Sequence, residues 1–182
     1  RTSLSPTDIG DIAGNYNTPI RASTDVFMPV VVSYTPIPPQ LACGSGFTLP
    51  TLTAVITDGN TGIPTTGSHS PQLWFRRSVP ATAWTHSSGT LSSGNGNSGT
   101  WSFTLDYTLL GISGPAIGET YQYYIAAQDQ SSNPTDPNIA FSSFDNSTPV
   151  FTNNNVNNQV TAPNTPAAFS VTPPMNGTVY VG

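Results

Sequence analysis

Lysine is absent from this chain, and charge of either sign is scarce. Charged residues make up 7% of its 182 residues, with four arginines and with Glu119 as the single glutamate. A surface that follows phosphates needs a dense set of cations, so we expect no nucleic acid partner. Solubility must come from Ser, Thr, Asn and Gln instead, a composition that favours a secreted bacterial surface protein over a cytosolic enzyme.

Long apolar runs and paired cysteines are also missing. No run approaches the roughly 20 apolar residues that span a bilayer, so membrane insertion is not expected. The lone Cys43 cannot close an internal disulfide, and no His–Asn/Asp set accompanies it, so a buried or loop thiol is favoured over a reactive nucleophile. Disorder is disfavoured because aromatic residues are 10% of the chain and fall in alternating runs.

The chain does contain short stretches of alternating character, and the clearest is GETYQYYIAAQD at residues 118–129. As a strand it presents two faces. One face carries Tyr121, Tyr123, Ile125 and Ala127, and the other carries Gln122, Tyr124, Ala126 and Gln128. Gly118, three residues before Tyr121, gives the spacing of a tyrosine corner, in which the tyrosine hydroxyl bonds back to upstream backbone.

Further strands are expected between clusters of Gly, Pro, Asn and Asp, and no stretch has the period of an amphipathic helix. The expected strands cover residues 26–37, 49–58, 71–80, 81–87, 101–107, 139–144 and 149–151. Residues 88–99, SGTLSSGNGNSG, are expected to form an exposed glycine-rich tip.

These stretches predict an all-β fold, an antiparallel Ig-like β-sandwich of about seven strands with extended terminal segments. The sandwich is expected over residues 26–152. Residues 1–25 have no sustained period and are predicted to be an N-terminal segment or linker. Composition turns Asn-rich after the sandwich, so residues 153–182 are predicted to be a C-terminal linker that leads into a next module or an intersubunit strand.

The strands LTAVITD, QLWFR, WSFTL and GETYQYYIAAQD resemble Ig-like or fibronectin III-like modules of very large secreted surface proteins of type IX-secreting bacteria. In such modules a YxYxIxAxD strand precedes a loop. The flanks add to the resemblance: DIGDIAG at 8–14 is similar to the DIGADA-like end of a β-helix module, and MNGTVYVG at 175–182 to the start of the next one. Asp11-Ile12 departs from that pattern, where alanine and aspartate would be expected. The resemblance implies a module with neighbours packed on both ends.

Catalytic chemistry finds little support. The carboxylates are scattered at strand ends and in loops, and His69 and His86 flank different loops without a third partner. No HExxH, P-loop or GxSxG motif occurs. We therefore expect no enzyme and no catalytic residues, with a small secreted hydrolase as the weakest alternative.

A calcium site is the one cofactor that the sequence suggests. Asp58, Asp129 and Asp136, together with Asn133 and Asn138, fall in loops expected at adjacent ends of the sandwich. Calcium takes six to eight oxygen ligands, which such loops supply. The alternative is that these side chains only cap turns, as Asp at strand ends commonly does.

Trp74, Trp84 and Tyr124 are the candidate contact residues. Exposed coplanar rings can stack on sugars, and the alternative is that the rings belong to the core or to a contact between modules. Tyr124 lies opposite the apolar set of its strand, which predicts a second contact surface that a neighbouring module would cover.

The sequence thus favours a structural or adhesive building block of an extracellular bacterial filament or surface adhesin. Its expected location is extracellular or at the cell surface, and its expected partners are neighbouring copies or modules of the same protein and surface glycans. The alternative is a carbohydrate-binding or accessory module of a secreted enzyme.

Overall fold

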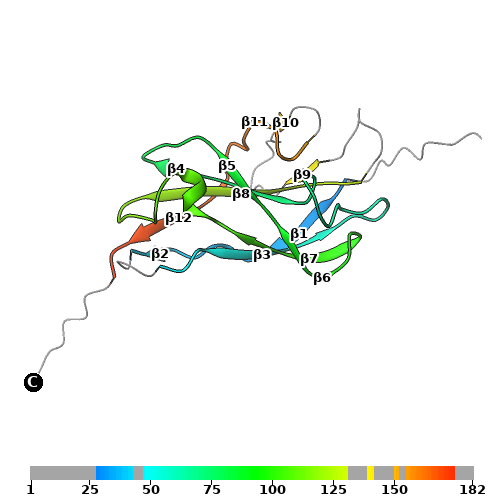
Figure 1. Ribbon diagram of the computed structural model, residues 1–182, viewed down its shortest axis with the longest axis horizontal. Helices are drawn as coiled ribbons and strands as arrows, with labels where there is room; N and C mark the ends of the chain where they lie inside the picture. Colours follow the sequence, from blue (N-terminus) through cyan, green and yellow to red (C-terminus); the bar gives the residue numbers. More distant parts are fainter. Residues whose placement is uncertain (1–27, 43–46, 131–138, 142–149, 152–154, 175–182) are drawn as a thin grey trace, which may run out of the picture.

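The computed structural model describes residues 28–42, 47–130, 139–141, 150–151 and 155–174. Two β-sheets face each other, and a short pair of strands lies outside them (Figure 1). The strands are β1 (Val30–Tyr34), β2 (Gln40–Leu41), β3 (Thr51–Thr57), β4 (Gln72–Val79), β5 (Thr85–Ser88), β6 (Thr90–Gly94), β7 (Ser98–Thr104), β8 (Thr120–Gln128), β9 (Ile139–Phe141), β10 (Val150–Phe151), β11 (Gln159–Thr161) and β12 (Ala167–Thr172). One 3-10 helix, η1 (Tyr107–Leu110), follows β7.

The first sheet has the order β1-β3-β7-β6, with antiparallel neighbours throughout. Its central strands alternate strictly between buried and more exposed positions, as the period-2 pattern predicts. Leu52, Ala54 and Ile56 of β3 point inward beside Trp101 and Phe103 of β7. Most of residues 88–99 are exposed, as expected, and they form a hairpin in which β6 pairs with β7 across a tight turn.

The second sheet has the order β2-β12-β8-β4-β5, and β9 also pairs with β8. Its neighbours are antiparallel except for β2 and β12, which run parallel. The prediction of an all-β sandwich is therefore confirmed, and the described residues contain twelve strands rather than about seven because several strands have only two or three residues.

The core lies between the two sheets. Large side chains fill it from both sides, among them Phe75, Trp101, Phe103, Tyr121 and Tyr123, each 2% exposed or less. Burying a side chain of this size contributes about 1.5–3 kcal/mol, which offsets part of the conformational entropy that the chain loses on folding.

The expected end of the sandwich at residue 152 is wrong, because β12 is an inner strand of the second sheet. Phe169 and Val171 of β12 point into the core, and the Phe169 ring stacks on Tyr121 with centroids 5.3 Å apart. The strand-like pattern around Val171 is visible in the sequence, but the Asn-rich residues before it led to its assignment to a next module rather than to the sandwich. The predicted segment 1–25 and residues 175–182 lie outside the described residues.

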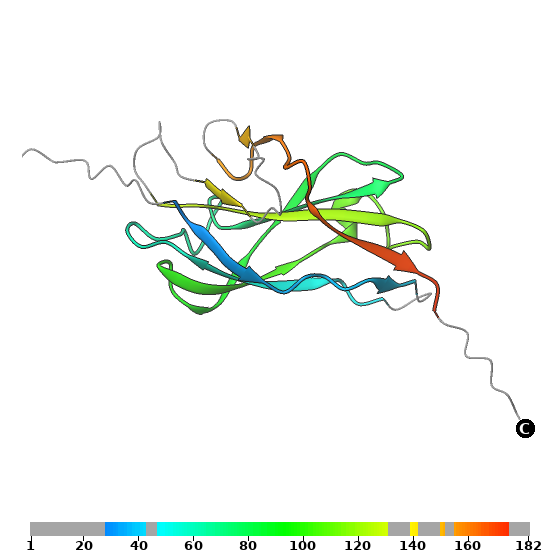
Figure 2. The same cartoon turned by 180° about the vertical axis from the view of Figure 1, so that it is seen from behind.

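β9 and β12 lie in line along one edge of β8, as Figure 2 shows. Phe141 pairs with Ala126 and Ala167 pairs with Tyr123, so only two residues of β8 separate the strands while the chain between them runs from 142 to 166. Within this excursion, residues 150–151 and 155–163, here called the outer segment, include β10 and β11 and lie outside the second sheet.

The sandwich has two ends, which we name the Asp58 pole and the Glu119 pole. At the Asp58 pole β1 begins beside the end of β3, and Gln130, just after β8, bonds to Gly62 in the loop after β3. At the Glu119 pole β8 begins and β12 ends, with Glu119 and Val171 bonded through their backbones. The described chain therefore starts at one end of the sandwich and finishes at the other (Figures 1 and 2).

Candidate functional site

The three candidate contact rings lie together on the outer face of β4 and β8, under the outer segment. Trp74 and Tyr124 stack with centroids 6.5 Å apart and planes 8° from parallel, and Trp84 meets Tyr124 edge-on at 5.3 Å. Val156 packs on them and is itself fully buried. Trp74 is 5% exposed and Tyr124 is 0% exposed, so neither ring presents a face to solvent.

Hydrogen bonds hold the outer segment in place. The Trp74 indole N–H donates to the Val156 carbonyl at 2.8 Å, and the Val156 N–H donates to the Gln128 side chain at 3.0 Å. Asn157 donates to the backbone of Ser68 in the neighbouring loop. The expectation that a neighbouring module covers this face is therefore wrong, because the chain covers it with its own residues.

Trp84 is the most accessible of the three rings, and the side chain of Arg76 lies over its face. The Arg76 guanidinium lies 4.9 Å from the centroid of the Trp84 ring and donates to the Gln122 side chain at 2.8 Å. A cation–π contact of this kind covers the ring face that a sugar would need.

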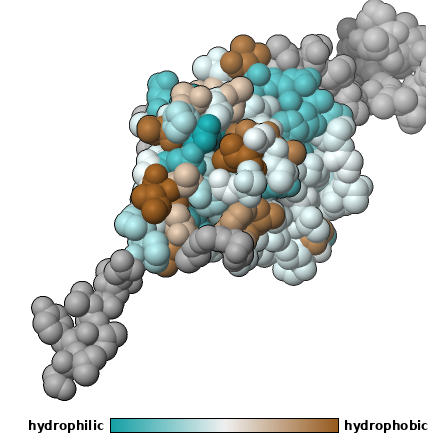
Figure 3. All heavy atoms as spheres, turned by 60° about the vertical axis from the view of Figure 1, so that its left-hand side comes forward, coloured by the Kyte–Doolittle hydropathy of each residue, from teal (hydrophilic) through white to brown (hydrophobic). Residues whose placement is uncertain are grey.

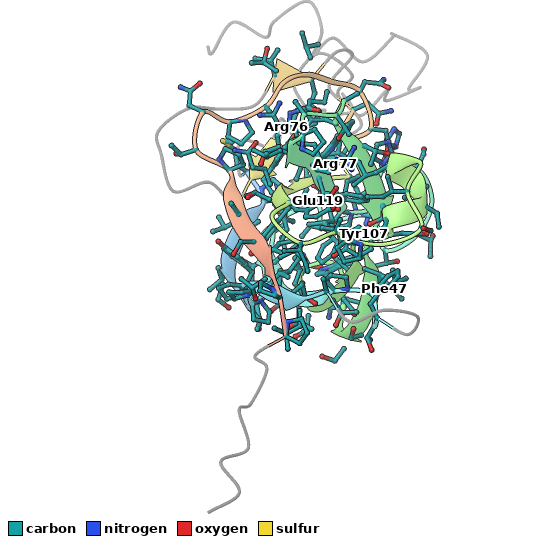
Figure 4. All side chains as sticks on the ribbon, turned by 90° about the vertical axis from the view of Figure 1, so that its left-hand side faces the viewer. Phe47, Arg76, Arg77, Tyr107 and Glu119 are labelled. Carbon is teal, nitrogen blue, oxygen red and sulfur yellow. The ribbon has the colours of Figure 1, made fainter. Side chains whose placement is uncertain are left out.

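A densely bonded polar group lies at the Glu119 pole. One carboxylate oxygen of Glu119 accepts from Arg77 at 2.6 Å, and the other accepts from the Tyr121 hydroxyl at 2.6 Å and from the Ala116 N–H at 2.8 Å. Figure 4 shows Arg77 and Glu119 side by side at this end. Burial alone would raise the pKa of Glu119, but the donors and the charge of Arg77 outweigh it and the pKa is lowered.

A stack of rings continues from this group toward solvent (Figure 4). Tyr121 meets Tyr107 edge-on at 5.1 Å, and Tyr107 meets Phe47 edge-on at 5.5 Å. Burial, followed by the charge of Glu119, raises the pKa of Tyr107, and burial together with the bond to Glu119 raises that of Tyr121. With these three donors, the Glu119 carboxylate links the strand that carries Arg77 to the start of β8.

The predicted tyrosine corner takes a different form. The Tyr121 hydroxyl donates to a side chain, that of Glu119, instead of to upstream backbone. It is Tyr123 whose hydroxyl reaches backbone far along the chain, accepting from the Ile37 N–H at 2.9 Å. The sequence reasoning missed the Arg77–Glu119 pair. The available signal was that Glu119, the sole glutamate, lies just before β8, while Arg77 lies on β4, which pairs with β8.

The two histidines stay apart and contact amides. His86 Nδ1 lies 3.0 Å from the Gln72 side-chain oxygen, and burial lowers the pKa of this histidine. His69 Nε2 lies 3.2 Å from the Asn155 side-chain nitrogen. Neither contact resembles a base held by a carboxylate next to a nucleophile.

The structure places two of the three predicted calcium ligands at the Asp58 pole. Asp58 follows β3 and Asp129 follows β8, and they are 1% and 2% exposed. Asp136, Asn133 and Asn138 lie outside the described residues. Asp58 does form the turn contact that was the alternative, because its Oδ1 accepts from the Asn60 N–H at 3.1 Å. In the described part of the chain no three His, Cys, Asp or Glu side chains cluster around one point.

An open groove of about 410 Å³ lies at the Glu119 pole. It is lined mainly by proline and apolar side chains: Pro38, Pro39, Leu41, Phe47 and Pro115, with Gln40 and Thr48. Figure 3, which turns this end forward, shows hydrophobic patches separated by paler and hydrophilic residues. Leu41 and the nearby turn residue Ile117 are 51% and 60% exposed.

Comparison of the chain with family models, curated proteins and solved structures finds no match in any of the three. None of the helical segments in the described residues has the length and apolar character needed to cross a membrane.

Proposed function

We propose that this chain is a structural or adhesive β-sandwich building block of an extracellular filament or surface adhesin. The observation that carries the proposal is that β1 begins at the Asp58 pole and β12 ends at the Glu119 pole. Modules with ends at opposite poles extend along a line when they are joined or stacked, whereas modules with both ends at one pole branch from it.

The Glu119 pole offers a surface for such end-to-end contact. Leu41 and Ile117 are exposed there beside the proline-lined groove. At the Asp58 pole, Met28 and Val30 at the start of β1 are about half exposed as well. Because charged residues are few, two poles can meet without burying unpaired charges, which are costly to desolvate.

A carbohydrate-binding module is supported less well. Two of the three rings that would form a sugar platform are buried under the outer segment, and the third carries Arg76 over its face. An enzyme is supported least, since Glu119 is bonded to three donors and both histidines contact amides. The low charge and the resemblance to secreted surface modules favour an extracellular location, with neighbouring copies or modules as partners.

Electron microscopy of the native material tests the proposal directly, and fibres are the expected result. For the chain alone, sedimentation and small-angle X-ray scattering over a concentration series should show elongated assemblies. Leu41→Arg should abolish them by placing a charge in the pole-to-pole contact. Val160→Arg, at an equally exposed residue of the outer segment, should leave them intact. Dispersed particles in the native material, or assemblies equally sensitive to both variants, would contradict the proposal.

A further inference from the structure

Two strands, one from each sheet, end at the Asp58 pole in an aspartate that faces inward. In β3 the buried residues are Leu52, Ala54 and Ile56, so Asp58 continues the inward set. In β8 the inward set of odd-numbered residues ends with Ala127, and Asp129 continues it. Both carboxylates therefore point from facing sheets into the space between them, because side chains two residues apart share a face.

The loops at this pole bring the two strand ends together. Gln130 donates its backbone N–H to Gly62 at 2.8 Å and its side chain to Ile63 at 3.2 Å, which joins the loop after β3 to the end of β8. Asn97, in the β6–β7 turn, donates to the carbonyl of Asp58 at 3.2 Å. Hydrogen bonds thus join three chain segments at this pole: the loop after β3, the β6–β7 turn and the residues that follow β8.

The described arginines are engaged elsewhere. Arg77 binds Glu119 at the opposite pole, and Arg76 lies over Trp84 on the outer face of the second sheet. Lysine is absent from the chain. A buried carboxylate needs a compensating cation or a full set of donors, because desolvation of an isolated charge is costly.

Asp58 lacks a full set of donors. Its Oδ1 accepts from Asn60, but its Oδ2 is buried and has no hydrogen-bond partner among the described residues. Buried polar atoms in native proteins are almost always partnered by protein, water or an ion, so the carboxylate oxygen Oδ2 of Asp58 has the capacity to take a ligand that the described residues do not supply.

We propose that the Asp58 pole binds one calcium ion between the two sheets, with the carboxylates of Asp58 and Asp129 as its anionic ligands. Two carboxylates neutralise a divalent cation, and Oδ2 of Asp58 gains its partner. The donors around the pole are oxygens of carboxylates, amides and backbone, which suit calcium rather than zinc or copper. Backbone carbonyls and water complete the shell of six to eight oxygens that calcium takes.

Such an ion would tie the loop after β3 to the end of β8 and so fix the pole at which β1 begins. The proposal stands apart from the filament proposal, because binding is measured on the single chain whether or not the chain assembles. If the aspartates had only a structural role, free calcium would not change the stability of the chain. The calcium proposal requires that it does.

Thermal unfolding of the whole chain, after EDTA treatment and dialysis, tests the site with CaCl2 as the probe. Extracellular modules bind calcium with dissociation constants of about 10⁻⁴–10⁻³ M, so 10 mM CaCl2 should raise Tm by about 3–8 °C. Asp58→Asn and Asp129→Asn should lose most of this rise. Asp106→Asn, at the cap of η1, is the matched control and should keep it.

Terbium luminescence, excited through the aromatic residues and displaced by calcium, provides a second readout that needs only wild-type protein. Saturable terbium binding that calcium reverses is the expected result. The proposal is overturned if calcium changes neither Tm nor terbium emission, if MgCl2 acts as strongly as CaCl2, or if Asp58→Asn folds and responds like wild type.

Discussion

The two poles of the sandwich differ in the donors that they provide to buried carboxylates. At the Glu119 pole one carboxylate receives three donors, including the guanidinium of Arg77. At the Asp58 pole two carboxylates are buried, and Oδ2 of Asp58 has no hydrogen-bond partner among the described residues. In a chain with four arginines and no lysine, a basic side chain is available for few carboxylates. The difference teaches that the chain itself supplies a cation to the carboxylate of one pole, whereas at the other pole our calcium proposal supplies it.

The largest expected effect comes from removing the carboxylate of the Glu119 pole. Glu119→Ala leaves Arg77, the Tyr121 hydroxyl and the Ala116 N–H without their acceptor. Breaking a largely buried pair in this way costs about 3 kcal/mol of unfolding free energy. Urea denaturation measures it, and a loss below about 1 kcal/mol would show that water replaces the carboxylate easily and that the pole is not closed.

A carboxylate-to-amide exchange at both poles compares them directly. In EDTA, Glu119→Gln should cost about 1–2 kcal/mol, because the charge-assisted bonds to Arg77 and Tyr121 weaken. In the same buffer, Asp58→Asn should be neutral or stabilise by up to about 1 kcal/mol, because a buried charge is removed while an acceptor for Asn60 remains. In CaCl2 only the Asp58 variant should become less stable than wild type. Equal losses for both variants in EDTA would remove the distinction between the poles.

At low pH, Glu119 should lose its contribution to the unfolding free energy. Its pKa is lowered in the folded protein, so its contribution is fully present above the unfolded value, about 4.3, and is lost as pH falls through the folded pKa. The gap in unfolding free energy between wild type and Glu119→Gln should therefore be constant from pH 7 to about 5 and should narrow as the pH falls further. Denaturation curves at these pH values in EDTA measure it, and a gap that widens in acid would mean that the folded pKa is raised.

Much of the fold was predictable because the main strands alternate strictly. The inward sets of β3, β7 and β8 follow from period 2 alone, and so does the inward direction of Asp58 and Asp129 once their strands are placed. That both aspartates lie at one pole depends on which strands face each other, and one sequence does not show this.

What the sequence concealed was long-range pairing. β12 follows an Asn-rich stretch that has the composition of a linker, yet it continues the edge that β9 begins on β8. The outer segment, which lies between β9 and β12, covers Tyr124. The outward direction of Tyr124 was predicted correctly, but a neighbouring module was expected to cover it. The partners of short strands such as β2 are set by tertiary contacts rather than by local pattern.

The smallest effect is expected at Asp106, which provides a third carboxylate for the comparison. It is half-buried, lies beside the first turn of η1 and accepts from the Thr108 N–H at 2.9 Å and the Thr108 hydroxyl at 2.7 Å. Asparagine caps as well as aspartate does, so Asp106→Asn should change the unfolding free energy by less than about 0.5 kcal/mol, in EDTA and in CaCl2 alike. If this variant cost as much as Glu119→Gln, loss of a negative charge anywhere would suffice to destabilise the chain. Burial and partners would then no longer explain why the two poles differ.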